Sequence, residues 1–197
     1  RDIGVTGVQT CALPISFARL NKAMTIEQFQ SVAEFLKREG ISARAFVLLQ
    51  PLGTPKDHSV EWAIKTVNQA HDWGVERTCV IPTRPGNGFL DQMMREGKWL
   101  PPDANQLESY LEQILLGRSK QALDTDVGQV YTVDLWNWGE LAGICTSCSE
   151  GRKSRLKWMN MQQQFIDLEF FLEGASSACN CRASGNTEES PIPSKKP

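Results

Sequence analysis

The stretch VERTCVIPTRPGNG, residues 75–88, decides the fold, because it reads as a strand that runs directly into a cluster of turn residues. The strand is expected over Val75–Ile81, and Pro82–Gly88 supplies the turn. Two further runs, Ala43–Leu49 and Gln129–Leu135, are short enough and apolar enough to be buried strands. We expect all three runs to lie in one parallel sheet with helices on one side.

Apolar residues at helical spacing separate the three expected strands. The capping-box pair Thr25 and Gln28 opens a helix that ends at Gly40. Further helices are expected from a cap at Asp57 or Ser59 to Gly74, near Phe89–Arg95, and over Asn105–Leu116. Strands that alternate with helices predict an α/β fold, and a sheet of only three strands indicates part of a larger (β/α) barrel.

The N-terminal residues look foreign to this pattern. Residues 5–15 read VTGVQTCALPI, which matches the in-frame translation of a common sequencing-library adapter. We therefore interpret residues 1–16 as a non-native, adapter-derived segment that packs poorly, and we expect Cys11 to bind nothing. On this interpretation, native sequence upstream is missing. The alternative is a genuine apolar strand with a turn at Pro14.

Composition narrows the class of protein. The chain has 197 residues and a formal net charge of −2, with 41% hydrophobic and 22% charged residues, as in an ordinary globular protein. A net charge this small does not indicate the electrostatic binding of nucleic acid or a membrane surface. No apolar run approaches the ~20 residues that span a bilayer. Without a signal-peptide layout, we expect a cytoplasmic protein. Residues 182–197 are rich in Ser, Pro, Glu and Lys and predict a disordered tail.

The turn after the second strand is one candidate binding site, since α/β enzymes place their sites at the C-terminal ends of parallel strands. Gly86 and Gly88 allow close approach of a ligand, and Arg84 offers donors for a carboxylate or phosphate. A plain turn with a surface arginine is the alternative.

The cysteines form a second candidate site. The chain has six, and four of them are grouped as Cys145 with Cys148 and Cys179 with Cys181. Two such pairs can supply four thiolates to a tetrahedral zinc or to an iron–sulfur cluster. Unligated thiols in a poorly ordered tail are the alternative. We accordingly define residues 141–181 as a cysteine-bearing, metal-binding appendage.

Other polar residues have less specific patterns. The helix expected between the cysteine pairs, about Gly151 to Phe165, carries a basic patch that either faces solvent or touches RNA: Arg152, Lys153, Arg155 and Lys157, beside Trp158. Cys79 is expected to be a small buried hydrophobe, and His71 a core histidine with satisfied hydrogen bonds. Asp134 faces either the mouth of the barrel or water.

Several motifs resemble, in order, the back half of a radical S-adenosylmethionine (SAM) domain: Leu20–Thr25, Arg44–Leu49 and Ile81–Gly88. They are most similar to the Elongator-catalytic-subunit-like and archaeosine-synthase-associated radical SAM proteins. Both cysteine pairs, with Arg155-Leu156 and Met159-Asn160 between them, resemble the C-terminal extension of one branch of these proteins. The resemblance covers about residues 17–181.

The resemblance implies that residues 17–140 are the C-terminal half of a partial (β/α) barrel. In the family, a CxxxCxxC motif holds a [4Fe–4S] cluster that cleaves SAM to a 5′-deoxyadenosyl radical. This sequence lacks that motif, so the chain alone is expected to be inactive. The residues that the resemblance places around the adenosine of SAM are Phe46, Leu48, Ile81, Pro82, Thr83, Arg84 and Gly86.

Two other functions compete with this interpretation. One is a zinc-binding module for RNA or protein on an α/β scaffold, for which tRNA is a candidate partner. The other is a (β/α) barrel enzyme that binds a phosphate at Thr83–Gly88. A CxxxCxxC motif in the upstream sequence would distinguish the radical SAM interpretation from both.

Overall fold

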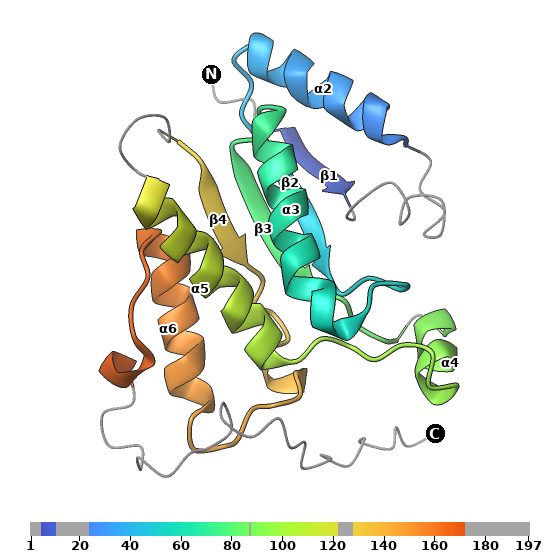
Figure 1. The fold of residues 1–197 in the computed structure, drawn as a ribbon, viewed down its shortest axis with the longest axis vertical. Coiled ribbons are helices and arrows are strands. Elements are labelled where there is room, and N and C mark those ends of the chain that lie inside the picture. The colour runs from blue at the N-terminus through green and yellow to red at the C-terminus, as the bar shows by residue number, and fades with distance from the viewer. Residues whose placement is uncertain (1–4, 11–23, 87, 122–127, 172–197) are drawn as a thin grey trace.

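A computed structural model describes residues 5–10, 24–86, 88–121 and 128–171 (Figure 1), with the backbone alone for 5–10 and 119–121. The tail predicted at 182–197 lies outside these residues. The strands are β1 (Val5–Thr10), β2 (Ala43–Leu49), β3 (Arg77–Pro82) and β4 (Val130–Val133). The helices are α2 (Ile26–Arg38), α3 (Ser59–Asp72), α4 (Phe89–Arg95), α5 (Ala104–Gln121) and α6 (Ser149–Gln162). Short 3-10 turns lie at Lys56–His58, Trp138–Glu140 and Leu168–Phe171.

The described strands form one parallel sheet in the order β1-β2-β3-β4. The predicted α/β fold and the three predicted parallel strands are therefore confirmed. Register places Phe46 beside Cys79 and Leu48 beside Ile81. Because all strands run the same way, the ends of β2, β3 and β4 meet at one edge of the sheet, where the loops that follow them gather (Figure 1).

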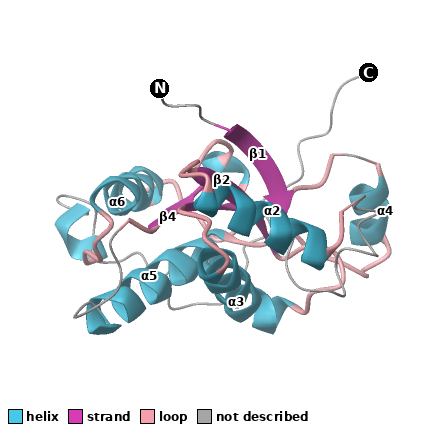
Figure 2. Ribbon diagram, turned by 90° about the horizontal axis from the view of Figure 1, so that it is seen from above, coloured by secondary structure: helices cyan, strands magenta, loops and turns pink. Residues whose placement is uncertain are grey.

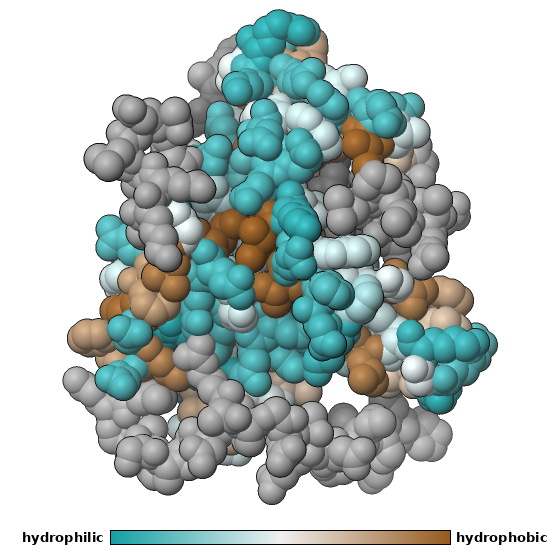
Figure 3. All heavy atoms as spheres, viewed as in Figure 1, coloured by the Kyte–Doolittle hydropathy of each residue, from teal (hydrophilic) through white to brown (hydrophobic). Residues whose placement is uncertain are grey.

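Helices α2, α3 and α5 lie against the same face of the sheet (Figure 2). Alternate residues of β2 point to that face and are fully buried, namely Ala45, Val47 and Leu49. The intervening Phe46 and Leu48 point to the opposite face, which these three helices leave open, and are half-buried. The outer surface of the helix layer is largely hydrophilic with a small apolar area at its centre (Figure 3).

One core joins the sheet to α3, α5 and α6. Strand residues such as Val47 and Val80 share it with Leu111 of α5 and with Leu156 and Met159 of α6. The predicted boundary at residue 141 therefore does not separate two hydrophobic cores. A smaller cluster packs α2 on β2. Within the described ranges, no helix has both the length and the apolarity needed to cross a membrane.

β1 corrects the prediction for the N-terminal segment. Val5–Thr10 pairs in parallel with β2, with Val8 opposite Ala45, so it does not stand outside the fold. A strand at the edge of a sheet presents unpaired backbone groups, and a segment rich in Val and Thr without proline can pair with it. The pairing concerns the backbone and leaves the adapter origin of residues 5–15 a prediction. Cys11 lies outside the described residues.

The helix starts differ in how they are capped. At α2, Thr25 accepts from Gln28 N–H and Gln28 accepts from Thr25 N–H, as the capping box predicts. α3 begins after His58 without a side-chain cap, so the expected cap at Asp57 or Ser59 is wrong. Ser59 instead is buried and accepts a hydrogen bond from Gln106 of α5 at 2.5 Å. That contact links the starts of α3 and α5.

The outer edge of β4 is covered by two amide side chains. Asn160 in α6 accepts from Val133 N–H and donates to Val133 C=O, both at 2.9 Å. Gln163, just after α6, makes the same pair of contacts with Tyr131 at 2.7 and 2.8 Å. Each amide therefore takes the place of a residue in a neighbouring strand. The sheet ends at β4 because α6 satisfies this edge.

Replacing Asn160 by leucine should lower the free energy of unfolding by about 1–3 kcal/mol, because the N–H and C=O of Val133 lose their partners inside the protein. Urea denaturation measures the change. Met161→Ala is the matched control, since its side chain is 77% exposed on the same turn of α6. Equal stabilities of the two variants would contradict the edge-capping role.

Candidate functional site

The residues predicted to line SAM divide between the two faces of the sheet. Phe46, Leu48 and Ile81 share the open face, with Leu48 and Ile81 in register as neighbours on β2 and β3. Pro82 and Thr83 are buried instead. The Thr83 hydroxyl donates to Leu49 C=O at 2.7 Å, so its polar atom fastens two strand ends together. The structure thus brings Phe46, Leu48 and Ile81 onto one surface and leaves Pro82 and Thr83 outside it.

Arg84 and Asp134 meet at the rim of this surface. Arg84 follows β3 and Asp134 follows β4, and their charged atoms lie 3.9 Å apart. The second carboxylate oxygen of Asp134 accepts from Trp136 N–H at 2.9 Å, and the Trp136 side chain is 84% exposed. Both charged side chains are about one-third exposed, so they contribute little to stability and are accessible to a ligand.

The glycine-rich turn is closed by a carboxylate. Gly86 N–H and Gly88 N–H donate to the same oxygen of Asp91 at 2.9 and 2.8 Å. Both glycines have positive φ, 111° and 78°, which a residue with a side chain rarely adopts. The two amides that would cradle a phosphate are therefore engaged by a negative group. This geometry favours the plain-turn interpretation over a phosphate site.

The carboxyl of Asp91 should titrate below its ordinary value of 3.8, because hydrogen bonds from Gly88 and Gly86 lower its pKa. A lowered pKa means that the contribution to the turn is present above 3.8 and is lost as the pH falls through the lower folded value. NMR should show the Gly86 and Gly88 amide signals moving together in that acidic range. In Asp91→Asn both signals should be insensitive to pH there; independent titration of the two amides would contradict the shared contact.

Gln50 fixes the end of β2, next to the candidate surface, and sequence reasoning missed it. It directly follows β2, has a positive φ of 54° and is 2% exposed. Its side chain donates to Leu100 C=O at 2.6 Å and accepts from Gln106 at 2.7 Å, while its own C=O accepts from the Trp99 indole at 3.0 Å. These bonds offset the backbone strain and fix the end of β2. A glutamine after an apolar run carries no sequence signal for this geometry.

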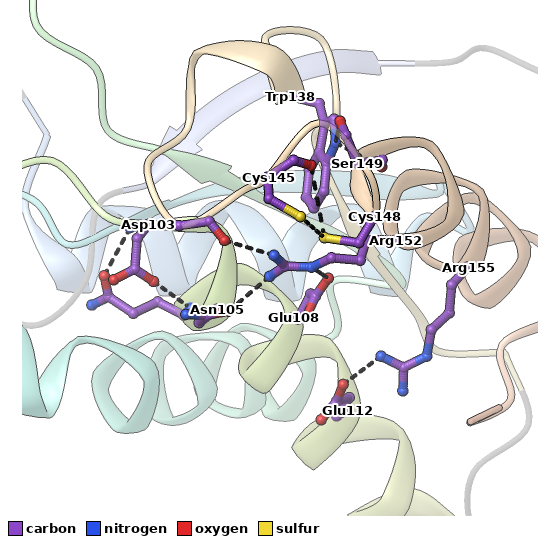
Figure 4. A network of polar contacts seen from close by, with 12 residues as sticks. Asp103, Asn105, Glu108, Glu112, Trp138, Cys145, Cys148, Ser149, Arg152 and Arg155 are labelled. Carbon is purple, nitrogen blue, oxygen red and sulfur yellow. Dashed lines mark hydrogen bonds and ion pairs between the residues drawn. The ribbon is translucent and has the colours of Figure 1, made fainter. Parts of the chain in front are cut away.

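The cysteine turn lies at the end of the molecule toward which β4 points, where α6 begins (Figure 1). The sulfur atoms of Cys145 and Cys148 point toward each other and lie 3.2 Å apart (Figure 4). Ser149 N–H donates to Cys145 C=O at 3.1 Å, which makes residues 145–149 one tight turn. Cys148 is buried and Cys145 is half-buried.

The predicted four-sulfur metal site stays a prediction, because Cys179 and Cys181 lie outside the described residues. Among the residues that the structure does describe, no three His, Cys, Asp or Glu side chains gather around one point. Two thiolates on a tetrahedral zinc lie roughly 3.8 Å apart, given Zn–S distances of about 2.3 Å. The observed 3.2 Å between Cys145 and Cys148 would have to lengthen by about 0.6 Å for the two sulfurs to share a zinc.

Half of the expected basic patch is internal, which corrects its interpretation as a solvated or RNA-binding face. Arg152 and Arg155 are almost fully buried, whereas Lys157 is exposed. Arg152 donates to Glu108 of α5 at 2.7 Å, and Arg155 pairs with Glu112 one turn further along α5 (Figure 4). The two arginines are three residues apart on the inner side of α6, so they face α5 rather than water.

Arg152 also fixes the loop before the cysteines. Its guanidinium donates to Gly143 C=O at 2.6 Å and to the Asn105 side chain at 2.7 Å, and it lies 5.8 Å from the centre of the Trp138 ring. Burial lowers the pKa of Arg152, but the hydrogen bonds and charges of Glu108 and Cys148 raise it by more, so the pKa lies above its ordinary value. Arg152 is therefore a permanent buried cation beside the cysteine turn. Acidic residues on the apolar stripe of α5 were the sequence signal for this pairing.

The prediction that His71 is a core histidine with satisfied hydrogen bonds is confirmed, and the prediction that Cys79 is buried is confirmed in part. His71 is buried and satisfied, with one ring nitrogen 2.6 Å from Val75 C=O and the other 3.3 Å from the Thr78 hydroxyl. Cys79 is half-buried on the open face, and burial raises the pKa of its thiol, which disfavours a role as nucleophile.

No protein-family model, curated protein or solved structure matches this chain.

Proposed function

We propose that this chain is the C-terminal part of a radical SAM enzyme and forms one wall of its partial (β/α) barrel. The observation that carries the proposal is the one-sided sheet. Helices α2, α3 and α5 cover one face of the parallel strands (Figure 2). The side chains of Phe46, Leu48, Cys79 and Ile81 alternate to the opposite face and are half-buried. A barrel wall has this layout, with helices outside and strand side chains pointing into the lumen.

The open face changes character along the strands, as a ligand-binding lumen requires. Arg44 and Arg77 are neighbours at the start of β2 and β3, where they are exposed. Leu48 and Ile81 are neighbours at the other end, followed by Arg84. An apolar surface with a few polar groups at its rim suits an adenosine, which has a large π-face and few groups to orient.

The edge of β4 supports an open barrel rather than a closed one. Asn160 and Gln163 occupy the hydrogen-bonding positions at which a further strand would pair. The wall therefore stops at β4, and on this proposal the earlier strands of the enzyme pair with β2, where Val5–Thr10 now pairs. A closed phosphate-binding barrel has less support, because Asp91 also fills its predicted anion site.

The cluster ligands must come from sequence outside this chain. A [4Fe–4S] cluster of this class needs three thiolates in the spacing CxxxCxxC, and none of the six cysteines has it. When bound, the cluster would supply the electron that cleaves SAM. Phe46, Leu48 and Ile81 would contribute apolar contacts to the adenosine, and Arg84 a positive charge at the rim.

The chain alone should form no 5′-deoxyadenosine above a no-protein control when it is incubated anaerobically with SAM and dithionite. The genomic sequence upstream should encode CxxxCxxC, and the extended protein with a reconstituted cluster should form that product. In the extended protein, Leu48→Glu or Ile81→Glu should weaken SAM binding about tenfold or more, equal to about 1.4 kcal/mol.

Leu116→Glu on the outer helix layer is the matched control, since Leu116 is 40% exposed and lies away from the open face. Unchanged SAM binding by the Leu48 and Ile81 variants would refute the assigned lining. An upstream sequence without the cysteine motif would refute the radical SAM proposal as a whole.

A further inference from the structure

The sulfur atoms of Cys145 and Cys148 lie close enough to form a disulfide after a small movement. The two sulfurs are 3.2 Å apart, and a disulfide needs about 2.05 Å, so closure requires a movement of only about 1.1 Å. The turn between the residues is already formed, since Ser149 N–H donates to Cys145 C=O. A CxxC pair beside βαβ units is the spacing that thiol–disulfide exchange uses.

The two cysteines differ in access, as the two steps of such an exchange require. Cys148 is 2% exposed and sits at the N-cap of α6, while Cys145 is half-buried and reachable. An external disulfide can therefore meet Cys145 first, and Cys148 can then attack from inside. The half-buried position suits a small disulfide such as oxidised glutathione.

A buried side chain holds the start of α6, and with it the cysteine turn, in place. Arg152 lies one helical turn after Cys148 and is fully buried. Its hydrogen bonds to Glu108, Gly143 and Asn105 hold it in place (Figure 4). The cysteine turn is therefore held on a fixed base, so only the two cysteine side chains need to move for the disulfide to close.

We propose that Cys145 and Cys148 form a redox-active dithiol that closes reversibly to a disulfide. The Cys145 thiolate attacks a sulfur of an external disulfide and releases one thiolate, which leaves a mixed disulfide. The Cys148 thiolate then attacks the Cys145 sulfur and releases the second thiolate. The two cysteines lose two electrons, the external disulfide gains them, and the protons of the cysteines end on the released thiols.

This proposal does not rest on the radical SAM assignment, and the tryptic map of the chain makes it directly testable. Cleavage after Lys120 and Arg152 places Cys145 and Cys148 alone in peptide 121–152, apart from Cys79 and from the pair at 179 and 181. The full chain, freed of metal with EDTA, is equilibrated with mixtures of reduced and oxidised glutathione, acid-quenched, alkylated and digested.

With excess oxidised glutathione, most of peptide 121–152 should be lighter by two hydrogen atoms and carry no alkyl group; reduced glutathione should restore two alkylation sites. Cys148→Ser should trap glutathione on Cys145, because the resolving thiol is gone. Cys145→Ser should leave Cys148 reacting about ten times more slowly, since it is buried.

Three results would overturn the proposal. The first is a peptide that takes two alkyl groups at every glutathione ratio. The second is glutathione on both cysteines without an internal disulfide. The third is one equivalent of zinc per chain that stays bound and blocks closure, which would make the turn a metal site instead.

Discussion

Replacing Arg152 by methionine should lower the free energy of unfolding by about 3–5 kcal/mol, because the buried carboxylate of Glu108 loses the positive charge that compensates it. Both side chains of the pair are fully buried, at 0% exposure. The substitution also removes the donors to Gly143 C=O and to the Asn105 side chain. Since a domain of this size is stabilised by only about 5–15 kcal/mol, the loss should be plain in urea denaturation.

Two controls separate the buried charge from other effects. Lys157→Met removes a positive charge from an exposed position of the same helix and should change stability by about 0.5 kcal/mol or less. The double variant Glu108→Leu with Arg152→Met should regain much of the loss, because it removes both buried charges. A loss below about 1 kcal/mol in Arg152→Met alone would show that the pair is hydrated.

The parallel strands were predictable because their signals are local. Ala43–Leu49 has the bounds of β2, and Phe89–Arg95 those of α4. Short apolar runs, glycine helix ends and a capping box each act within a few residues, so the sequence states them directly. The residues predicted to line the adenosine do not share one surface, because alternation along a strand sends Pro82 and Phe46 to opposite faces.

The residues that sequence reasoning misjudged depend on partners far along the chain. Arg152 and Arg155 look like solvent-exposed charges until α5 brings Glu108 and Glu112 against them, 44 and 43 residues away. Gln50 likewise takes its strained backbone from contacts with residues 99–106. The signal for the arginine pairs lies on the distant helix α5, in its inward-facing acidic residues, and no feature near Gln50 signals its contacts.

The prediction that the N-terminal segment packs poorly was wrong for a related reason. Pairing at the edge of a sheet uses backbone groups, so many different sequences can pair there. β2 offers its backbone groups to any extended segment of suitable propensity, and Val5–Thr10 provides one. This makes the adapter interpretation and the observed strand compatible. If the upstream strands of the proposed barrel were present, they would compete for the same edge of β2.

Because α6 and the sheet share one core, we expect them to unfold together. Substitution of Trp138 tests this most directly, since this residue contacts both. Trp138 follows β4, is 2% exposed and packs in the same core as Leu156 and Met159 of α6. Its indole N–H donates to Ser149 at the start of α6, at 3.1 Å to the C=O and 3.2 Å to the hydroxyl. It therefore joins the end of the sheet to the cysteine turn.

Trp138→Ala should lower the free energy of unfolding by about 3–5 kcal/mol through the cavity it leaves. Trp138→Phe keeps most of the packing and loses the hydrogen bond, so about 0.5–1.5 kcal/mol of its loss comes from that bond. Trp136→Ala, two residues away and 84% exposed in the parent side chain, should change stability by about 0.5 kcal/mol or less.

Hydrogen exchange then decides whether residue 141 separates two folding units. If α6 shares one cooperative core with the strands, Trp138→Ala should speed exchange at Val133 in β4 and at Leu156 in α6 by the same factor, since both open in one global transition. A loss of protection confined to α6, with β2 and β3 as protected as before, would instead show an independent appendage. Because Val47 and Leu49 of β2 belong to the same buried cluster as Met159, we expect the single transition.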